Sequence, residues 1–206
     1  AIRQNTNFIE AKRPRLVLIL SGDHVYKMDY RLLRAFHDER GAALTVACLR
    51  LPAEEAAGNF GVMEVDEEGR IVGFEEKPKE PKRIPGTDDC LASMGIYLFE
   101  TDALRGALDS DHLDFGKDVI PMLIARGAPV FAYDFTSRNV IPEWEFVKLE
   151  GIRRKVLVPR ASDSDYWRDV GTLEQYWLAN LDLVKPHPKF NVYGEQFPLF
   201  SAPGHF

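Results

Sequence analysis

The sequence predicts a layered α/β domain, because short apolar runs alternate along it with segments of helical periodicity. Its 206 residues suffice for one ordinary domain, or for one domain with an incomplete appendage. Apolar residues make up 45% and charged residues 28% of the chain, which is the balance of a folded protein rather than a disordered one. We therefore expect a sheet covered by helices.

The first predicted strand covers residues 16–20, a continuous apolar run typical of a strand buried on both faces. The residues before it are expected to lie already within a helix. Apolar side chains at helical spacing then predict a helix over residues 29–40, ended by Gly41. Residues 44–51 follow as the next buried strand.

A hairpin is predicted where two alternating segments, 60–65 and 70–75, flank the turn 66–69. The proline-bearing stretch 77–90 is expected to form a loop. The remaining predicted elements are a strand (91–99), a helix (101–108), a helix (116–125) ended by Gly127, a strand (130–135) and a helix that begins at the capping residues 172–175 and reaches about Leu183.

Residues 137–166 fit no single pattern. They contain the basic run 153–155, followed by the apolar run 156–158. A surface insertion and an additional edge element of the sheet are both compatible with this composition, and the sequence leaves the two open.

The charge balance excludes some classes of partner. Lys and Arg number 26 against 32 Asp and Glu, so the formal net charge is −6, which argues against general nucleic-acid binding. No apolar run is long enough to span a bilayer, and no signal-peptide pattern opens the chain. Cys48 and Cys90 have neither metal-ligand spacing nor neighbouring cysteines, so we expect no disulfide, no zinc site and a cytoplasmic location.

The first candidate ligand site follows the first strand, since ligands of open α/β sheets bind at the carboxyl ends of strands. Gly22 allows a ligand to approach the backbone, and Asp23 offers a carboxylate suited to Mg²⁺. The alternative is that Asp23 caps the turn before the next helix. His24 is expected to be a structural hydrogen-bonding residue.

The second candidate site ends the hairpin, at residues 74–78. Lys77 could neutralise a phosphate, and Glu76 could accept hydrogen bonds from sugar hydroxyls. The alternative is an exposed ion pair at a strand end.

The third candidate site is the segment 167–172. Asp169 could complete a magnesium site with Asp23, and Trp167 could wall off a sugar. The alternative is a buried tryptophan anchor beside a local Arg–Asp pair.

The strand 91–99 offers a candidate ligand floor. Strand alternation places Ser93, Gly95 and Tyr97 on one face, although a packed tyrosine is the ordinary outcome. Motifs for acyl transfer and for P-loop chemistry are absent from the sequence.

Together these segments resemble the bacterial ADP-glucose pyrophosphorylases, also called glucose-1-phosphate adenylyltransferases. The segments that carry the resemblance occur in the order and spacing of that family: 20–26, 60–63, 75–78, 91–97, 114–118 and 166–172. The resemblance implies a Rossmann-like nucleotidyltransferase domain with a mixed, mostly parallel sheet, incomplete at its N-terminus.

The resemblance also implies a reaction, ATP + α-D-glucose 1-phosphate → ADP-glucose + pyrophosphate, in glycogen biosynthesis. Asp23 and Lys77 would be the catalytic residues, and Asp23 would hold Mg²⁺ together with Asp169. The residues implied to bind the substrates are Gly61, Glu76, Lys77, Ser93, Tyr97, Asp114, Phe115 and Trp167.

Departures from the family pattern shape the expected domain organisation. The family's opening strand and its Gly-rich, Arg-bearing loop have no counterpart here, nor has its C-terminal β-helix. We therefore expect residues 1–183 to be a partial catalytic domain, with 137–166 as a possible insertion. Residues 184–206 would connect toward the missing β-helix, and this chain alone would be inactive.

Two other functions stay open at this stage. The chain could be a catalytically silent regulatory subunit or paralogue. It could also be a sugar nucleotidyltransferase, or a glycosyltransferase of similar topology, that uses UTP, dTTP or GTP. The family resemblance further implies a homotetramer for the full-length protein.

Overall fold

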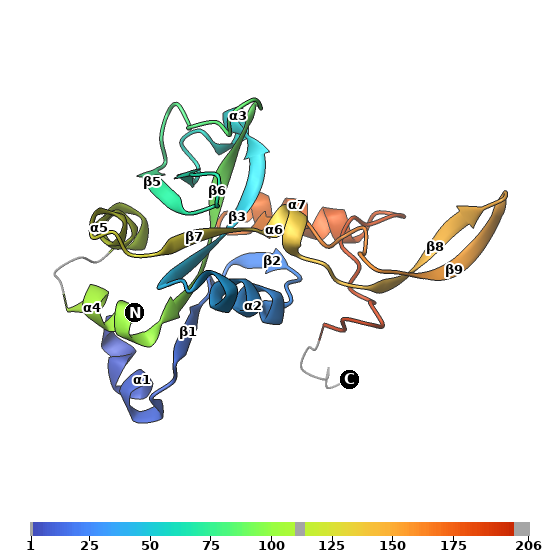
Figure 1. Ribbon diagram of the computed structural model, residues 1–206. Helices are drawn as coiled ribbons and strands as arrows, with labels where there is room; N and C mark the ends of the chain where they lie inside the picture. Colours follow the sequence, from blue (N-terminus) through green and yellow to red (C-terminus); the bar gives the residue numbers. More distant parts are fainter. Residues whose placement is uncertain (1, 110–113, 200–206) are drawn as a thin grey trace. The chain divides into compact units, whose positions relative to one another are not determined.

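The computed structural model describes residues 2–109 and 114–199, and the last part of the predicted connector, 200–206, lies outside the described residues. The chain forms two compact units, drawn in Figure 1. Unit 1 comprises residues 1–21 and 30–136, and unit 2 comprises residues 22–29 and 137–206.

Unit 1 is built on a six-stranded sheet of order β5-β4-β6-β3-β7, with β1 also pairing with β6. Its strands are β1 (Leu16–Ile19), β3 (Leu44–Pro52), β4 (Gly61–Val65), β5 (Ile71–Glu76), β6 (Asp89–Glu100) and β7 (Val130–Asp134). Strands β1, β3, β4 and β7 run in one direction, while β5 and β6 run in the other. The predicted mixed sheet, with most of its strands running in one direction, is thus confirmed. Only β3 and β7 are parallel neighbours, because β5 and β6 run against the other four strands and lie beside them.

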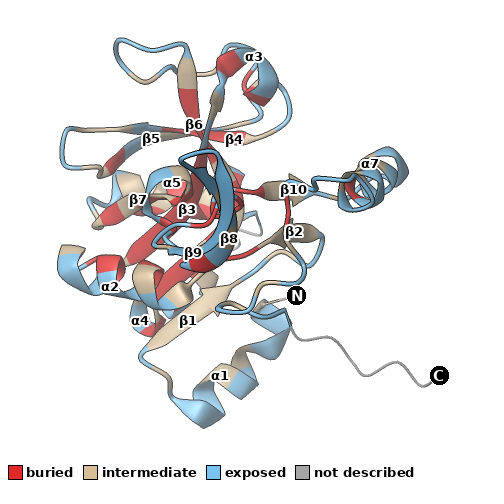
Figure 2. Ribbon diagram, turned by 90° about the vertical axis from the view of Figure 1, so that its right-hand side faces the viewer, coloured by how far each residue is buried: buried red, intermediate tan, exposed pale blue. Residues whose placement is uncertain are grey.

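Helices cover both faces of this sheet. On one face lies α2 (Tyr30–Arg40), where the Phe36 ring stands edge-on to Tyr133 and His37 hydrogen-bonds Thr45. On the other lie α4 (Thr101–Leu108), η2 (Phe115–Val119) and α5 (Ile120–Ala125), packed against the apolar core that includes Leu44 and Phe99. Figure 2 shows the buried residues gathered on the strands between these layers. The chain also contains four short helices: η1 (Arg3–Asn5), α1 (Thr6–Lys12), α3 (Ala53–Ala56) and α6 (Phe135–Arg138).

The expectation that the first strand is buried on both faces is wrong. All four residues of β1 are only half-buried. The strand pairs with β6 along one edge, and no other described strand pairs with it. An apolar run reports the polarity of a strand but not how many neighbours it has, so an edge position cannot be read from it.

The predicted helix over 116–125 begins with a π-helical turn rather than an α-helical one. In η2 the amide of Val119 donates to the carbonyl of Asp114, five residues earlier. Pro121, near the start of α5, has no N–H to offer an α-helical hydrogen bond. The wider turn therefore lies where the proline would interrupt an α-helical ladder.

Unit 2 contains two small antiparallel sheets and one longer helix. Strand β2 (His24–Tyr26) pairs with β10 (Trp167–Asp169), and β8 (Glu143–Leu149) pairs with β9 (Ile152–Val158). Helix α7 (Leu173–Leu183) begins as predicted, with the Thr172 side chain accepting from the amide of Gln175. The segment 137–166 thus contains a hairpin that forms a sheet of its own, and its status as an insertion stays a prediction.

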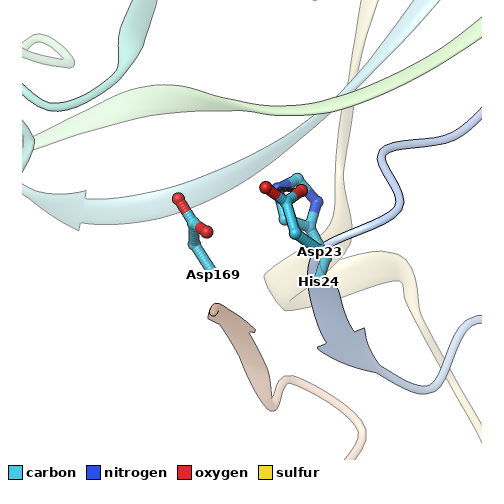
Figure 3. A group of neighbouring side chains, drawn as sticks. All are labelled: Asp23, His24 and Asp169. Atoms are coloured by element: carbon cyan, nitrogen blue, oxygen red, sulfur yellow. Dashed lines mark ion pairs between the residues drawn. The ribbon is translucent and has the colours of Figure 1, made fainter. Parts of the chain in front are cut away.

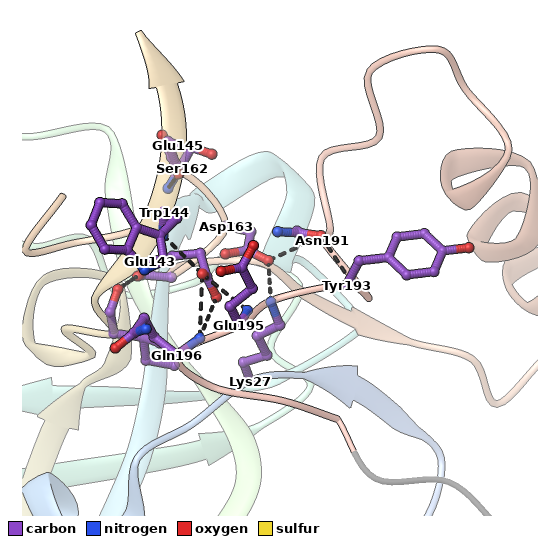
Figure 4. Close-up of polar contacts among 12 residues, drawn as sticks. Lys27, Glu143, Trp144, Glu145, Ser162, Asp163, Asn191, Tyr193, Glu195 and Gln196 are labelled. Carbon is purple, nitrogen blue, oxygen red and sulfur yellow. Dashed lines mark hydrogen bonds and ion pairs between the residues drawn. The ribbon is translucent and has the colours of Figure 1, made fainter. Parts of the chain in front are cut away.

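A buried polar cluster lies inside unit 2 (Figure 4). The ammonium of Lys27 contacts the Asp163 carboxylate at 2.8 Å, and both side chains are at most 2% exposed. Glu143 accepts hydrogen bonds from the backbone amides of residues 144, 195 and 196. Burial alone would raise the pKa of Glu143, but these amides and Lys27 lower it overall. The cluster therefore attaches the segment 191–196 to β2 and β8.

Cys48 and Cys90 are both buried free thiols, so the two form no disulfide. Each helix among the described residues is too short or too polar to span a bilayer.

Candidate active site

Two carboxylates and an imidazole meet in unit 2 (Figure 3). Asp169 ends β10 directly opposite His24 of β2, and Asp23 precedes that strand. One ligand atom from each of Asp23, His24 and Asp169 lies within 4.8 Å of the other two. The predicted pairing of Asp23 with Asp169 is thus found as a spatial neighbourhood.

A tight turn supports this cluster. The amide of Val170 donates to the Asp23 carbonyl at 2.8 Å, and the amide of Gly171 donates to Asp169 Oδ1 at 2.7 Å. A Cβ atom at Gly171 would lie 3.0 Å from Asp169 Oδ1 and 3.1 Å from Asp23 Oδ2. A side chain at position 171 would therefore push both carboxylates away by a few tenths of an ångström, and glycine avoids this.

The capping alternative for Asp23 is wrong, since its carboxylate accepts no hydrogen bond from the described residues. Asp23 and Asp169 are both exposed, and carboxylate oxygens are the ligands that Mg²⁺ prefers. The residues present therefore fit a divalent cation.

His24 does not take the structural hydrogen-bonding role expected of it. Its Nε2 lies 3.6 Å from Asp23 Oδ1, beyond hydrogen-bond range, and its buried Nδ1 has no partner among the described residues. Burial lowers the pKa of this imidazole, and the nearby carboxylates Asp23 and Asp169 only partly counteract the shift. Burial therefore favours the neutral form of His24.

The alternative for this segment was a buried tryptophan anchor beside a local Arg–Asp pair, and the structure places Trp167 and Arg168 differently. Trp167 is half-buried and stands edge-on to the His24 ring at 4.8 Å. The Arg168 guanidinium donates to Asp182 at 2.6 Å and to Gln175 at 3.2 Å, so the local Arg–Asp pair involves α7. No described cation pairs with Asp169, which leaves its charge for a bound ion.

Unit 1 holds the other predicted residues, grouped around Glu76. Glu76 ends β5 opposite Gly61 of β4. A Cβ atom at Gly61 would lie 2.8 Å from Glu76 Oε2, and one at Gly116 would lie 2.5 Å from the same oxygen. The carboxylate thus fits between two backbones that carry no side chain there.

Lys77 follows Glu76 in an unusual backbone conformation. Its φ of 52° lies in the left-handed region, which side-chain-bearing residues rarely adopt, and Pro78 follows it directly. Its side chain is exposed and forms no ion pair within the described part of the chain. The alternative of an exposed ion pair is therefore wrong, and the strained backbone presents an unpaired cation, as functional residues often are.

Ser93 and Tyr97 share a face of β6, as the alternation predicted. The Tyr97 ring stacks on the Phe115 ring, with the ring centroids 5.4 Å apart. Burial raises the pKa of Tyr97, and the negative charges of Glu76 and Asp114 raise it further, so its hydroxyl stays a donor.

A bulge opposite Cys48 adds an irregularity that strict alternation does not anticipate. Ala47 pairs with Ile96 while the next residue, Cys48, pairs with Ser93, so two residues of β6 are extra. One of them, Gly95, has a φ of 68°. The bulge keeps Ser93 and Tyr97 on one side despite the broken register.

Asp114 has a structural role that can be seen directly. Its side chain caps η2 by accepting from the amide of Lys117 at 2.9 Å. Contact with a sugar stays a prediction for Asp114, as it does for Phe115, whose ring packs on Tyr97 and Phe99.

The predicted residues therefore fall into two groups, each inside one unit. Unit 1 holds Gly61, Glu76, Lys77, Ser93, Tyr97, Asp114 and Phe115; unit 2 holds Asp23, Trp167 and Asp169. Sequence reasoning missed Gly116, Gly171 and the position of His24. Both glycines could have been found from their positions in the sequence. Gly116 directly follows Phe115, and Gly171 lies two residues after Asp169.

Comparison with known proteins identifies relatives along nearly the whole chain. The family model described as "Nucleotidyl transferase" matches residues 1–185. A glucose-1-phosphate adenylyltransferase of Shewanella baltica is 47% identical over 208 residues, covering 98% of this chain and 44% of the relative. Glucose-1-phosphate adenylyltransferase 1 of Vibrio vulnificus is 46% identical over 209 residues, covering 98% of this chain and 46% of the relative. The chain thus spans less than half the length of these curated relatives.

Proposed function

This chain belongs to the nucleotidyl transferase family, and from that premise we propose that it acts in the transfer of the adenylyl group of ATP to α-D-glucose 1-phosphate, giving ADP-glucose and pyrophosphate. The observation that carries the proposal is the similarity to glucose-1-phosphate adenylyltransferases along 98% of the chain. The two groups of side chains described above would supply the chemistry that this reaction requires.

The carboxylates of unit 2 would hold the metal. Nucleotidyl transferases use a divalent ion, and we assign Mg²⁺ to Asp23 and Asp169 because both offer hard, exposed oxygen ligands. A bound divalent ion would neutralise negative charge on the phosphates of ATP as pyrophosphate leaves. Gly171 contributes by leaving room for both carboxylates and by orienting Asp169 through its amide.

The group in unit 1 would bind the sugar phosphate. The Lys77 ammonium is a compact charge with no described ion-pair partner, suited to the phosphate of glucose 1-phosphate. Glu76, held between Gly61 and Gly116, would accept hydrogen bonds from sugar hydroxyls, with the Tyr97 hydroxyl as a donor nearby.

The reaction asks little of a protein base. A sugar phosphate is already anionic near neutral pH, so its oxygen can attack the α-phosphorus of ATP without first losing a proton. The main obstacle is to bring two polyanions together and to stabilise the departing pyrophosphate, which calls for cations and positioning. Lys77 would supply one positive charge, and Asp23 and Asp169 would hold the metal that supplies the other.

The direct test is to measure product formation by the protein encoded by the longest open reading frame that contains this sequence. We expect ADP-glucose to form from ATP, glucose 1-phosphate and Mg²⁺, and ATP to outcompete UTP, dTTP and GTP in mixtures. UDP-glucose as the main product would instead indicate another sugar nucleotidyltransferase. Substrate binding without any sugar-nucleotide product would indicate a silent subunit.

Replacing Gly116 by alanine should weaken the binding of glucose 1-phosphate at least about tenfold, because the new methyl group displaces the Glu76 carboxylate that would hold the sugar. Overall stability should change little, since the atom that comes closest, Glu76 Oε2, is at the far end of a flexible side chain and the Phe74 ring lies farther away, at 3.2 Å. Calorimetric titration of the chain with glucose 1-phosphate measures this.

Gly106→Ala in α4 is the matched control, because a Cβ atom there meets nothing within 4 Å. It should raise helix stability by up to about 1 kcal/mol and leave sugar-phosphate affinity unchanged. Unchanged affinity in Gly116→Ala would remove Glu76 from the proposed sugar site.

We propose in addition that the protein serves glycogen biosynthesis in the cytoplasm and that its full-length form is a homotetramer. These statements follow the family resemblance. Sedimentation of the full-length protein would measure the assembly.

A further inference from the structure

The imidazole of His24 is a buried polar group without hydrogen bonds. Its side chain is 10% exposed, Nδ1 has no partner within the described residues, and Nε2 lies 3.6 Å from Asp23 Oδ1. Buried polar atoms in folded proteins are nearly always hydrogen-bonded, so an imidazole left in this state calls for an explanation. The Asp23 and Asp169 carboxylates beside it suggest one (Figure 3).

We infer that His24 is a third protein ligand of the divalent cation held by Asp23 and Asp169, coordinating it through a ring nitrogen. The inference rests on the metal-binding part of the proposed function and adds a ligand to it. Neutral imidazole nitrogen is a common metal ligand in proteins.

The strand pairing brings this ligand to the cluster. His24 and Asp169 are directly opposite each other in the antiparallel β2–β10 pair, and residues so paired project their side chains to the same face. Asp23 is the preceding residue, outside the strand, so its carboxylate can turn toward the same point. One atom of each residue then lies within 4.8 Å of the others.

The Trp167 ring restricts how the imidazole can move. It stands edge-on to His24 with the ring centroids 4.8 Å apart. An imidazole packed in this way loses little rotamer freedom when it binds a metal, because it is already ordered. Trp167 would thus act as a positioning residue for His24.

A nitrogen ligand changes which cations the site prefers. Mg²⁺ favours oxygen ligands, whereas Mn²⁺, Co²⁺ and Zn²⁺ also accept imidazole well. The chain should therefore lose more affinity for Mn²⁺ than for Mg²⁺ when His24 is replaced, with a decrease of at least about tenfold for Mn²⁺.

The test is pulsed electron paramagnetic resonance of Mn²⁺ bound to the untagged, unmodified chain. Directly coordinated imidazole gives a ¹⁴N coupling, which we expect to observe. The coupling should disappear in His24→Leu and persist in His187→Leu, a matched change at an exposed histidine of the same unit. Because the first measurement needs no variant, a folding defect in His24→Leu would not obscure the result.

The contrary outcomes are separable. Mn²⁺ bound without ¹⁴N coupling, or with a coupling that survives in His24→Leu, overturns the role of His24 and leaves the carboxylate site intact. No Mn²⁺ binding by the unmodified chain overturns both the metal site of the proposed function and this inference. Binding that Asp169→Asn abolishes, together with a coupling that His24→Leu abolishes, supports both.

Discussion

Lys27→Met is expected to destabilise unit 2 by about 3–5 kcal/mol, because it leaves the Asp163 carboxylate buried without its cation. The ammonium and the carboxylate are 2.8 Å apart, and their side chains are 1% and 2% exposed. Asp163 would keep one hydrogen bond, from the amide of Asn191 at 2.9 Å, which cannot replace a full positive charge. Methionine matches the length and apolar stem of lysine, so the change removes charge with little change of volume.

Hydrogen exchange of the full chain under native conditions measures this effect locally. Amides of β8, β9 and residues 191–196 should lose protection in Lys27→Met. Lys155→Met is the matched control: its partner Glu195 lies at 2.6 Å, but the two side chains are 42% and 60% exposed. Such a surface pair contributes at most about 1 kcal/mol. Equal losses of protection in the two variants would contradict the buried role of Lys27.

The strands of unit 1 were predictable because their apolar runs must be buried and because glycines and prolines mark where they end. The Phe60 to Glu75 hairpin is an example, since its turn is held by Asp66, which accepts from the amides of Glu68 and Arg70. The cap of α7 by Thr172 was also predictable, because the capping side chain and the amide that donates to it are only three residues apart.

Features that depend on distant partners were not predictable in this way. The edge position of β1 depends on which strands lie beside it, and a run of apolar residues carries no such information. The bulge in β6 depends on the register with β3. The long hairpin of β8 and β9 has exposed apolar residues on its strands, including Phe146 and Ile152, so its composition resembled no standard amphipathic pattern.

The residues of the candidate site also divide into those that local sequence could predict and those that depend on distant partners. Asp23, Glu76, Lys77 and Asp169 could be proposed because each ends a strand or lies beside one, and their chemistry is local. The environment of His24 could not, since its burial and its place opposite Asp169 arise only when β2 pairs with β10. The fit of Glu76 against Gly116 likewise joins residues 40 positions apart.

Asp169→Asn is expected to lower the rate of ADP-glucose formation by about 10²–10³-fold, because a bound metal contributes several kcal/mol to stabilising transition-state charge and each factor of ten corresponds to about 1.36 kcal/mol. The asparagine keeps the oxygen that accepts from the Gly171 amide at 2.7 Å, so the turn beside it should persist. What is lost is the negative charge, which no described cation neutralises. The rate is measured with the protein encoded by the longest reading frame, and the Mg²⁺ affinity with the 206-residue chain.

Asp165→Asn is the matched control for this change, since Asp165 is an exposed carboxylate only four residues away in the same segment. It should leave both the rate and the Mg²⁺ affinity unaltered. A comparable loss in Asp165→Asn would mean that general acidity of the segment, rather than the pairing of Asp169 with Asp23, attracts the cation. Retention of full Mg²⁺ affinity in Asp169→Asn would place the metal elsewhere, because two carboxylates that share one ion each contribute to its binding.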